Sequence, residues 1–314
     1  MQLFKDERYA NYSRNWTEAI ILCYFSLMKV AIAQISSVLG RVDKNLERHL
    51  ELIEKAVKEK AELIIFPELS LTGYSLKDLV PEVAIRPDSS EVMARLLAAS
   101  KDIDLVIGLV EERRENPGIF YNSAAYLSLG KIAHIHRKVF LPTSGMFEEA
   151  RFFARGHDFR AFPIGSNRTG LLICRDFLHY SSSYCLMADG AGLIIAVSAA
   201  PGRGITDEGS QCFQSSPNWE LMGQAISYFS SAYVIYCNRV GIEDGATFAG
   251  GSFIYTPDGQ LNLKLPYLEP DFSLQEINLD LIRIARKNRP YKRDDRPEAI
   301  WRSLGRLIRV QDED

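Results

Sequence analysis

The sequence predicts an α/β fold in which helices cover sheets of mostly apolar strands. Two observations lead to this prediction: short apolar runs recur along the 314-residue chain, and several are followed by a stretch with the apolar spacing of a helix. Apolar residues make up 46% of the chain and charged residues 25%, which is normal for a soluble globular protein with its own core. Because no composition break, internal repeat or low-complexity segment marks a linker, we expect one domain.

The first half of the chain is predicted to alternate strands with helices and then to form a hairpin. The clearest helix carries Leu46, Leu50, Ile53 and Val57 at the spacing of a single apolar face. The hairpin is expected to turn at Gly130. The expected elements are a strand at 29–34, a helix at 45–60, a strand at 63–66, a helix at 89–100, a strand at 105–110 and hairpin strands at 124–129 and 131–136.

The second half continues this alternation. Strands are expected at 170–174 and 193–197, on either side of a helix at 181–188. A helix at 218–230 and a strand at 233–238 follow. The last expected hairpin joins strands 251–255 and 260–265 around Pro257-Asp258-Gly259.

Charge and cysteine content argue against several classes of function. The net charge is -3, so no field of the whole chain favours nucleic acid or an anionic membrane. The tail 283–309 is locally basic, but acidic residues interrupt it, which favours a solvated or subunit-facing surface over an RNA site. The five cysteines are widely spaced and never form Cys-x-x-Cys, which is typical of a reducing cytoplasm rather than of a disulfide framework or zinc knuckle. The histidines show no metal-ligand spacing on a helix, so no metal site is expected.

Three residues of complementary chemistry stand where predicted strands end. Glu68 follows the apolar run 63–67, Lys138 follows 132–137, and Cys174 follows 170–173. A carboxylate, an ammonium and a thiol held together by strands provide a general base, an oxyanion stabiliser and a nucleophile. The three residues therefore predict amide hydrolysis by a cysteine nucleophile.

Each of the three residues also has an ordinary structural interpretation. A thiol at the end of an apolar strand is usually a small buried hydrophobe, and the two charges could be solvated. The polar pair Arg175-Asp176 favours catalysis, because it indicates a turn that exposes the thiol in a cleft. A papain-like pair of Cys174 with His179 is an alternative, although it leaves Glu68 and Lys138 without a role.

Long stretches of the chain resemble the nitrilase, or carbon-nitrogen hydrolase, superfamily, and within it the glutaminase domain of glutamine-dependent NAD synthetases. The resemblance begins at Met28 and ends near Arg302. It is carried by Phe66-Pro67-Glu68-Leu69-Ser70-Leu71-Thr72-Gly73-Tyr74-Ser75-Leu76-Lys77-Asp78-Leu79, by His136-Arg137-Lys138-Val139-Phe140-Leu141-Pro142, by Phe147-Glu148-Glu149-Ala150-Arg151-Phe152-Phe153, and by Asn238-Arg239-Val240-Gly241-Ile242-Glu243-Asp244-Gly245 with Thr247-Phe248-Ala249-Gly250-Gly251-Ser252.

This resemblance implies a four-layer αββα sandwich and a Glu-Lys-Cys triad of Glu68, Lys138 and Cys174. It further implies that Glu149 supports the lysine, that the backbone N–H of Arg175 helps to hold an oxyanion, and that no cofactor is needed. The substrate is expected to contact Tyr74, Phe147, Ser198 and Arg203, although Ser-Ala-Ala-Pro replaces the family's usual Ala-Ser-Pro near Ser198.

The expected domain spans 28–314, and residues 1–27 are expected to be an N-terminal extension, which is either an added arm or the product of translation from a start codon upstream of the true one. The apolar run 19–28 is too short to span a bilayer, and acidic residues precede it, so neither a membrane anchor nor a signal peptide is expected.

The sequence thus predicts a cytoplasmic hydrolase that converts a small primary carboxamide to an acid and ammonia through a cysteine thioester. Two alternatives remain. One is a nitrilase, although Arg175-Asp176 stands where true nitrilases have Trp-Glu. The other is an ammonia-supplying partner of a separate synthetase, since the chain lacks the Ser-Gly-Gly-x-Asp-Ser loop of an ATP-using synthetase domain. The resemblance also implies a homodimer or a larger homo-oligomer.

Overall fold

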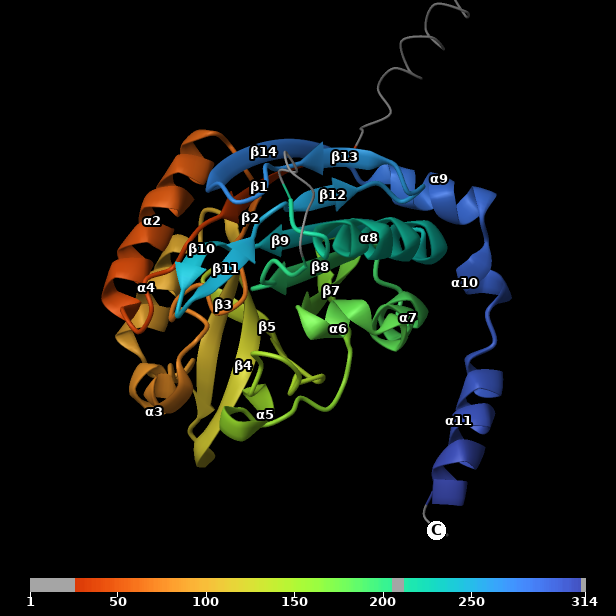
Figure 1. Cartoon of the computed structure of the whole chain (residues 1–314). Coiled ribbons are helices and arrows are strands. Elements are labelled where there is room, and N and C mark those ends of the chain that lie inside the picture. The colour runs from red at the N-terminus through yellow and green to blue at the C-terminus, as the bar shows by residue number, and fades with distance from the viewer. Residues whose placement is uncertain (1–25, 205–211, 312–314) are drawn as a thin grey trace, which may run out of the picture.

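The computed structural model describes residues 26–204 and 212–311, and in this part of the chain two six-stranded sheets lie between layers of helices (Figure 1). The strands of the first sheet follow the order β14-β1-β2-β3-β4-β5. Their bounds are β1 Leu27–Gln34, β2 Leu63–Ile65, β3 Asp104–Arg113, β4 Asn116–Ser128, β5 Lys131–Arg137 and β14 Asp271–Asn278. The neighbours β1, β2 and β3 run parallel, while the other pairs in this sheet are antiparallel.

The second sheet has the order β13-β12-β9-β8-β7-β6. Its strands are β6 Ala161–Ile164, β7 Asn167–Ile173, β8 Leu193–Ser198, β9 Tyr233–Asn238, β12 Phe253–Tyr255 and β13 Leu261–Lys264. A separate two-stranded hairpin is formed by β10 (Val240–Glu243) and β11 (Ala246–Ala249). The central strands β7, β8 and β9 are parallel, and each is followed by a connection that contains a helix or hairpin.

Alternating side chains along the buried strands explain why the two sheets stack. Val30 and Ile32 on β1 face the second sheet, where they share one apolar cluster with Ile195 and Ile235. The intervening Ala31 and Ala33 belong to a different cluster, on the opposite face of the first sheet. A strand buried on both faces needs apolar residues at every position, which is why these strands read as continuous apolar runs.

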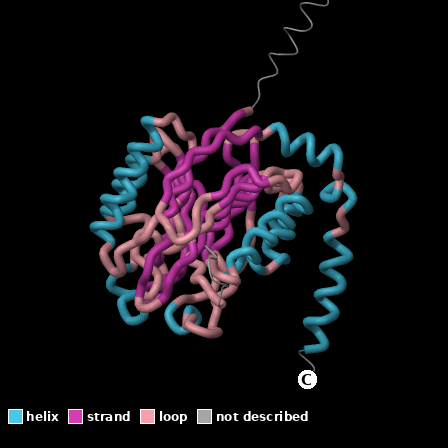
Figure 2. Tube along the Cα trace, turned by 45° about the horizontal axis from the view of Figure 1, so that its top comes forward, coloured by secondary structure: helices cyan, strands magenta, loops and turns pink. Residues whose placement is uncertain are grey.

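Helices cover the outer face of each sheet (Figure 2). On the first sheet, α2 (Val42–Lys58) and α4 (Glu91–Ala99) bury Leu46, Ile53 and Leu96. On the second, α7 (Tyr180–Ala188) and α8 (Ser216–Ser230) contribute Leu186 and Ile226 to a third cluster. The other helices are α3 Val80–Val83, α5 Glu149–Phe152, α6 Arg175–Leu178, α9 Asp280–Asn288, α10 Tyr291–Asp294 and α11 Pro297–Gln311, with a 3₁₀ turn at Lys77–Leu79. The predicted αββα sandwich is therefore confirmed.

Three strand features were absent from the prediction. The strand β6, the hairpin β10–β11 and the edge strand β14 all lie outside the expected elements. The strand β14 pairs with β1 along its whole length, for example Ala31 with Leu274. Because β14 and β1 are so far apart in sequence, no local pattern predicts that they pair.

The C-terminal helix α11 runs away from the two sheets (Figure 1). It exposes the apolar side chains of Ile300, Trp301, Leu304, Leu307 and Ile308. No helix among residues 26–204 and 212–311 is long and apolar enough to cross a membrane. Of the N-terminal extension expected at 1–27, all but its last two residues lie outside the described part, and Leu27 already belongs to β1.

Candidate active site

The three residues singled out in the sequence all follow the end of a strand. Glu68 comes three positions after the end of β2, Lys138 directly follows β5, and Cys174 directly follows β7. The strands β2 and β5 belong to the first sheet, whereas β7 belongs to the second, which faces it. The stacking of the two sheets therefore brings these three strand ends into one site.

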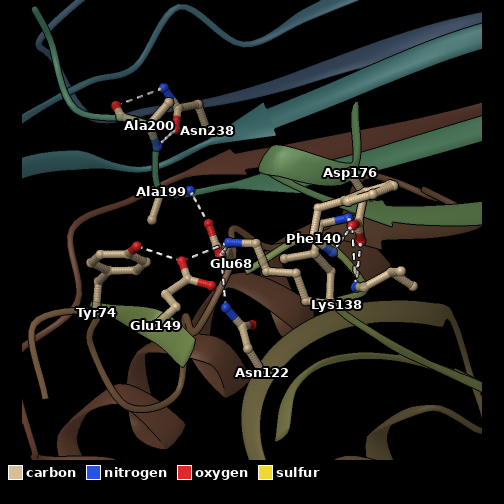
Figure 3. A network of polar contacts seen from close by, with 12 residues as sticks. Glu68, Tyr74, Asn122, Lys138, Phe140, Glu149, Asp176, Ala199, Ala200 and Asn238 are labelled. Atoms are coloured by element: carbon tan, nitrogen blue, oxygen red, sulfur yellow. Dashed lines mark hydrogen bonds and ion pairs between the residues drawn. The ribbon is translucent and has the colours of Figure 1, made fainter. Parts of the chain in front are cut away.

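Lys138 lies at the centre of a buried ionic cluster (Figure 3). Its Nζ donates one hydrogen bond of 2.7 Å to Glu68 Oε1 and another of 2.7 Å to Glu149 Oε1. The Lys138 side chain is 0% exposed, and those of Glu68 and Glu149 are 0% and 4% exposed. A buried ammonium is tolerated because two carboxylates compensate its charge.

Glu68 accepts two further hydrogen bonds from residues that the sequence had not indicated. Asn122 Nδ2 donates to Oε1 at 2.7 Å, and the backbone N–H of Ala199 donates to Oε2 at 2.7 Å. Oε1 therefore accepts two bonds and Oε2 only one. Since each carboxylate oxygen can accept about two hydrogen bonds, Oε2 keeps the capacity to receive a proton.

Glu149, and not its neighbour Glu148, reaches the lysine. Glu148 is exposed, whereas Glu149 begins α5 and is buried. The hydroxyl of Tyr74 donates a 2.5 Å hydrogen bond to the same oxygen, Glu149 Oε1, that Lys138 contacts. Burial raises the pKa of Glu149 to about 7, and the charge of Glu68 acts in the same direction, while Lys138 and Tyr74 oppose the rise. Burial lowers the pKa of Lys138, but the two carboxylates outweigh it and hold that pKa above its usual value.

The backbone of Cys174 adopts a conformation that is rare for a residue with a side chain. Its φ is 46° and its ψ is -98°. Its N–H still bonds to the carbonyl of Val197 on the neighbouring strand, and its carbonyl accepts from Phe177 N as α6 begins. A sharp turn between strand and helix of this kind presents a side chain at the sheet edge, at a cost of roughly 1–3 kcal/mol in backbone strain. Such strain is concentrated at functional sites.

Burial holds the thiol of Cys174 in its neutral form. Burial raises the pKa of Cys174 to about 12, and the charge of Glu68 adds to the rise, while Lys138 and the Ser198 hydroxyl lower it. Ser198 ends β8 and is 0% exposed. Its Oγ lies beside the thiol, where it acts on the pKa of Cys174.

Asp176 ties the cysteine turn to the lysine loop. Its carboxylate accepts a hydrogen bond from Phe140 N at 2.9 Å (Figure 3). It also accepts hydrogen bonds from Val139 N at 3.2 Å and His136 Nε2 at 2.9 Å. These three partners flank Lys138, while Asp176 itself lies two residues after Cys174. One buried carboxylate therefore fixes the separation between the second and third predicted catalytic residues.

Two adjacent cavities lie at the site, one at the thiol of Cys174 and the other at Glu149. A cavity of 160 Å³ is lined by Cys174, Arg175 and Arg203, and a cavity of 370 Å³ is lined by Tyr74 and Glu149. Phe147 lines both cavities, and the guanidinium of Arg203 lies 4.7 Å from the centre of its ring. All four expected substrate contacts thus lie on these cavities or beside the thiol.

The histidines considered as alternatives make structural contacts. His179 stacks on the ring of Phe140, with 3.7 Å between ring centres. His136 bonds to Asp176, and His134 stacks on Phe162 at 4.4 Å. Among the described residues, no group of three or more His, Cys, Asp or Glu is arranged to hold a metal ion.

Comparisons with curated proteins place the chain beside glutamine-dependent NAD(+) synthetases. The enzyme of Acinetobacter baylyi is 31% identical over 255 residues, which cover 80% of this chain and 44% of the synthetase. The enzyme of Thermotoga maritima is 26% identical over 257 residues, which cover 81% of this chain and 42% of that protein. The chain therefore spans less than half the length of these relatives.

Solved structures share the fold. The glutamine-dependent NAD+ synthetase of Acinetobacter baumannii superposes with a TM-score of 0.71 at 28% identity, over 82% of this chain and 47% of that one. A carbon-nitrogen hydrolase from Helicobacter pylori gives a TM-score of 0.74 at 24% identity, over 87% of this chain and 96% of that one. The family model for carbon-nitrogen hydrolases matches residues 29–287, and the chain therefore belongs to the carbon-nitrogen hydrolase family.

Proposed function

We propose that the protein hydrolyses a primary carboxamide to a carboxylic acid and ammonia, with Cys174 as nucleophile, Glu68 as general base and Lys138 as oxyanion stabiliser. The observation that carries this proposal is the buried cluster in which Lys138 Nζ bridges Glu68 and Glu149, with the Cys174 thiol within its electrostatic influence. A carboxylate that retains acceptor capacity beside a neutral thiol is an arrangement suited to proton transfer at the moment of attack.

The reaction begins with the thiol rather than with a preformed thiolate. Because the pKa of Cys174 is raised to about 12, its proton passes to Glu68 as the sulfur bonds to the amide carbon. The oxygen of the tetrahedral intermediate gains negative charge, which the ammonium of Lys138 and the backbone N–H of Arg175 stabilise. The first turn of a helix leaves its N–H groups without intrahelical partners, and Arg175 begins α6.

Collapse of the intermediate breaks the carbon–nitrogen bond. Glu68 returns its proton to the departing nitrogen, ammonia leaves, and a thioester remains on Cys174. Glu68 then takes a proton from water as the water oxygen attacks the thioester carbon. The carbon–sulfur bond breaks, the acid is released, and the proton on Glu68 returns to the sulfur.

Ammonia release is the direct test. Purified protein is assayed with aliphatic amides, glutamine, asparagine and small nitriles, and the Cys174→Ala variant serves as the blank. We expect at least one amide to release ammonia well above the blank, with nitriles slower. If no amide or nitrile exceeds the blank, whether or not a synthetase is added, the hydrolase proposal is wrong and a binding role is favoured.

A second candidate is a glutaminase-like supplier of ammonia to a separate synthetase. The similarity to glutamine-dependent NAD(+) synthetases favours it, because those proteins are named for their use of glutamine. Arg203 also favours it: a guanidinium that lines the cysteine cavity suits an amide substrate that carries a carboxylate. Stimulation of glutamine hydrolysis by an added synthetase would distinguish this candidate from an independent amidase.

The Arg203→Ala variant tests whether the substrate carries a carboxylate. For glutamine we expect KM to rise about thirtyfold with little change in kcat, since a charge-assisted hydrogen bond contributes roughly 2 kcal/mol. For a neutral amide of similar size, KM should change less than about threefold. Steady-state kinetics on both substrates provides the comparison, and equal losses on the two would exclude a role in carboxylate recognition.

A further inference from the structure

Glu243 is a buried carboxylate that the cysteine chemistry does not use. It is the last residue of β10 and lies within the sequence stretch 238–245, whose chemistry the mechanism leaves unassigned. Its side chain is 4% exposed. A buried charge needs compensating partners, so the groups around Glu243 indicate what it does.

The carboxylate holds a loop of the first sheet. Glu243 Oε1 accepts from the backbone N–H of Tyr74 at 2.8 Å and from that of Ser75 at 2.6 Å. A Cβ on Gly73 would lie 2.8 Å from Glu243 Oε2, and Gly73 has a φ of +82°. Glycine therefore permits both the turn and the close approach of the carboxylate.

A cation fixes the other oxygen of Glu243. Arg239 Nη1 donates to Oε2 at 3.0 Å, and its guanidinium lies 4.2 Å from the centre of the Phe248 ring on β11. The Phe248 ring in turn meets the ring of Tyr74 edge-on, with 5.8 Å between centres. The hairpin β10–β11 thus contacts Tyr74 in two ways: Glu243 binds the backbone N–H of Tyr74, and Phe248 packs against the Tyr74 ring.

Tyr74 carries the connection into the ionic cluster. Its hydroxyl donates to Glu149 Oε1, which also accepts from Lys138. The second oxygen, Glu149 Oε2, is buried and has no hydrogen-bond partner among the described residues. Glu149 is therefore oriented by two donors on one oxygen, and one of them depends on the position of the 73–75 loop.

We propose that Glu243 is a positioning residue for the amide-hydrolysing site: it fixes the 73–75 loop so that the Tyr74 hydroxyl holds Glu149 against Lys138. This inference rests on the proposed function, because it concerns the same site. Glu243 supports that site from the hairpin β10–β11, which belongs to neither of the two main sheets. Without Glu243, the loop loses its two carboxylate bonds and Tyr74 no longer has a fixed distance to Glu149.

A pH profile separates this role from simple structural support. The groups that face Glu149 are Lys138, Glu68, Tyr74 and Cys174, and the Tyr74 bond lowers the pKa of Glu149 from the value that burial would otherwise impose. The ionised carboxylate is the form that accepts both bonds. Ammonia release should therefore fall as pH decreases through a midpoint near 7 in the wild type, and loss of the Tyr74 bond should raise that midpoint.

The test compares Glu243→Gln, Glu243→Ala and Tyr74→Phe in the full chain. We expect kcat to fall about tenfold in Glu243→Ala and less in Glu243→Gln, because a neutral amide oxygen still accepts the two loop bonds, but more weakly. The acidic midpoint should move up by about one pH unit in Glu243→Ala and in Tyr74→Phe. The double variant Glu243→Ala/Tyr74→Phe should move the midpoint no further than either single variant, because both substitutions remove the bond from the Tyr74 hydroxyl to Glu149. Ile242→Thr, which alters the neighbouring exposed residue of β10, should match the wild type.

A second measurement tests the role of Glu243 without any amide substrate. The rate of Cys174 alkylation by iodoacetamide, followed by mass spectrometry of its peptide, responds to the charge of Glu149 and should show the same midpoint shift. Unchanged midpoints in folded Glu243→Gln and Glu243→Ala, or additive shifts in the double variant, would overturn the inference. If no amide is hydrolysed but the alkylation midpoint still moves, the proposed function fails while Glu243 remains a positioning residue.

Discussion

Replacement of Cys174 by alanine is expected to reduce ammonia release by at least about a thousandfold. The physical reason is that, among the described residues, no other side chain at the 160 Å³ cavity places a nucleophilic atom beside both Glu68 and Lys138. Cys174→Ser should also be nearly inactive, because a hydroxyl gives up its proton far less readily than a thiol. The measurement is initial-rate ammonia release on the best substrate of the amide screen.

Cys185 provides a matched control for this prediction. It lies on α7 and is exposed, so Cys185→Ala removes a thiol without touching the cavity. This variant should keep wild-type activity. Full activity in Cys174→Ala would contradict the proposed mechanism.

Replacement of Lys138 by methionine is expected to impair both catalysis and stability. Removal of a positively charged oxyanion partner should lower kcat by about a hundredfold to a thousandfold. The substitution also leaves Glu68 and Glu149 buried without their shared cation, which should cost about 3–5 kcal/mol in the free energy of unfolding. Ammonia release and denaturant unfolding measure the two effects.

The stability loss should depend on pH in a defined direction. The pKa of Glu149 is already raised to about 7 from the ordinary 4.5 of a glutamate, and loss of the ammonium raises it further. A carboxyl whose pKa is higher in the folded state favours folding below its unfolded pKa, and this contribution is lost as pH rises through the folded pKa. Lys138→Met should therefore be destabilised most at pH 8 and least near pH 4.5.

Two further variants check the origin of this loss. Lys138→Met combined with Glu149→Gln should recover part of the stability at pH 8 but none of the activity, because it removes one unpaired charge. Lys77, whose side chain is 60% exposed and pairs with Asp244, is the control for stability: Lys77→Met should leave the free energy of unfolding nearly unchanged, because an exposed ion pair contributes little. An equal loss of stability at both pH values in Lys138→Met would mean that the buried carboxylates are not its cause.

The main elements of the fold could be predicted because their signals are local. A buried strand such as β8 needs apolar side chains on both faces, and helix α2 needs an apolar stripe, and both patterns are visible within one segment. The edge strand β14 lacks such a signal, because most of its residues are only half-buried. Its place is decided by pairing with β1, which lies more than two hundred residues earlier in the chain.

The sequence by itself determined which chemical groups the site holds and that each follows a strand. The resemblance had already named Glu149 and Lys138, and the tertiary structure shows how they differ from their neighbours: Glu149 is buried while Glu148 is exposed, and Lys138 is buried while the half-buried Arg137 pairs with Glu111. The structure alone also revealed Asn122, the Ala199 N–H, Asp176 and Glu243 as partners of the cluster or of its loops. The reason is physical: Lys138 meets Glu68 across 70 residues and Glu243 meets Tyr74 across 169, and such contacts exist only once the folded chain has brought these distant segments together.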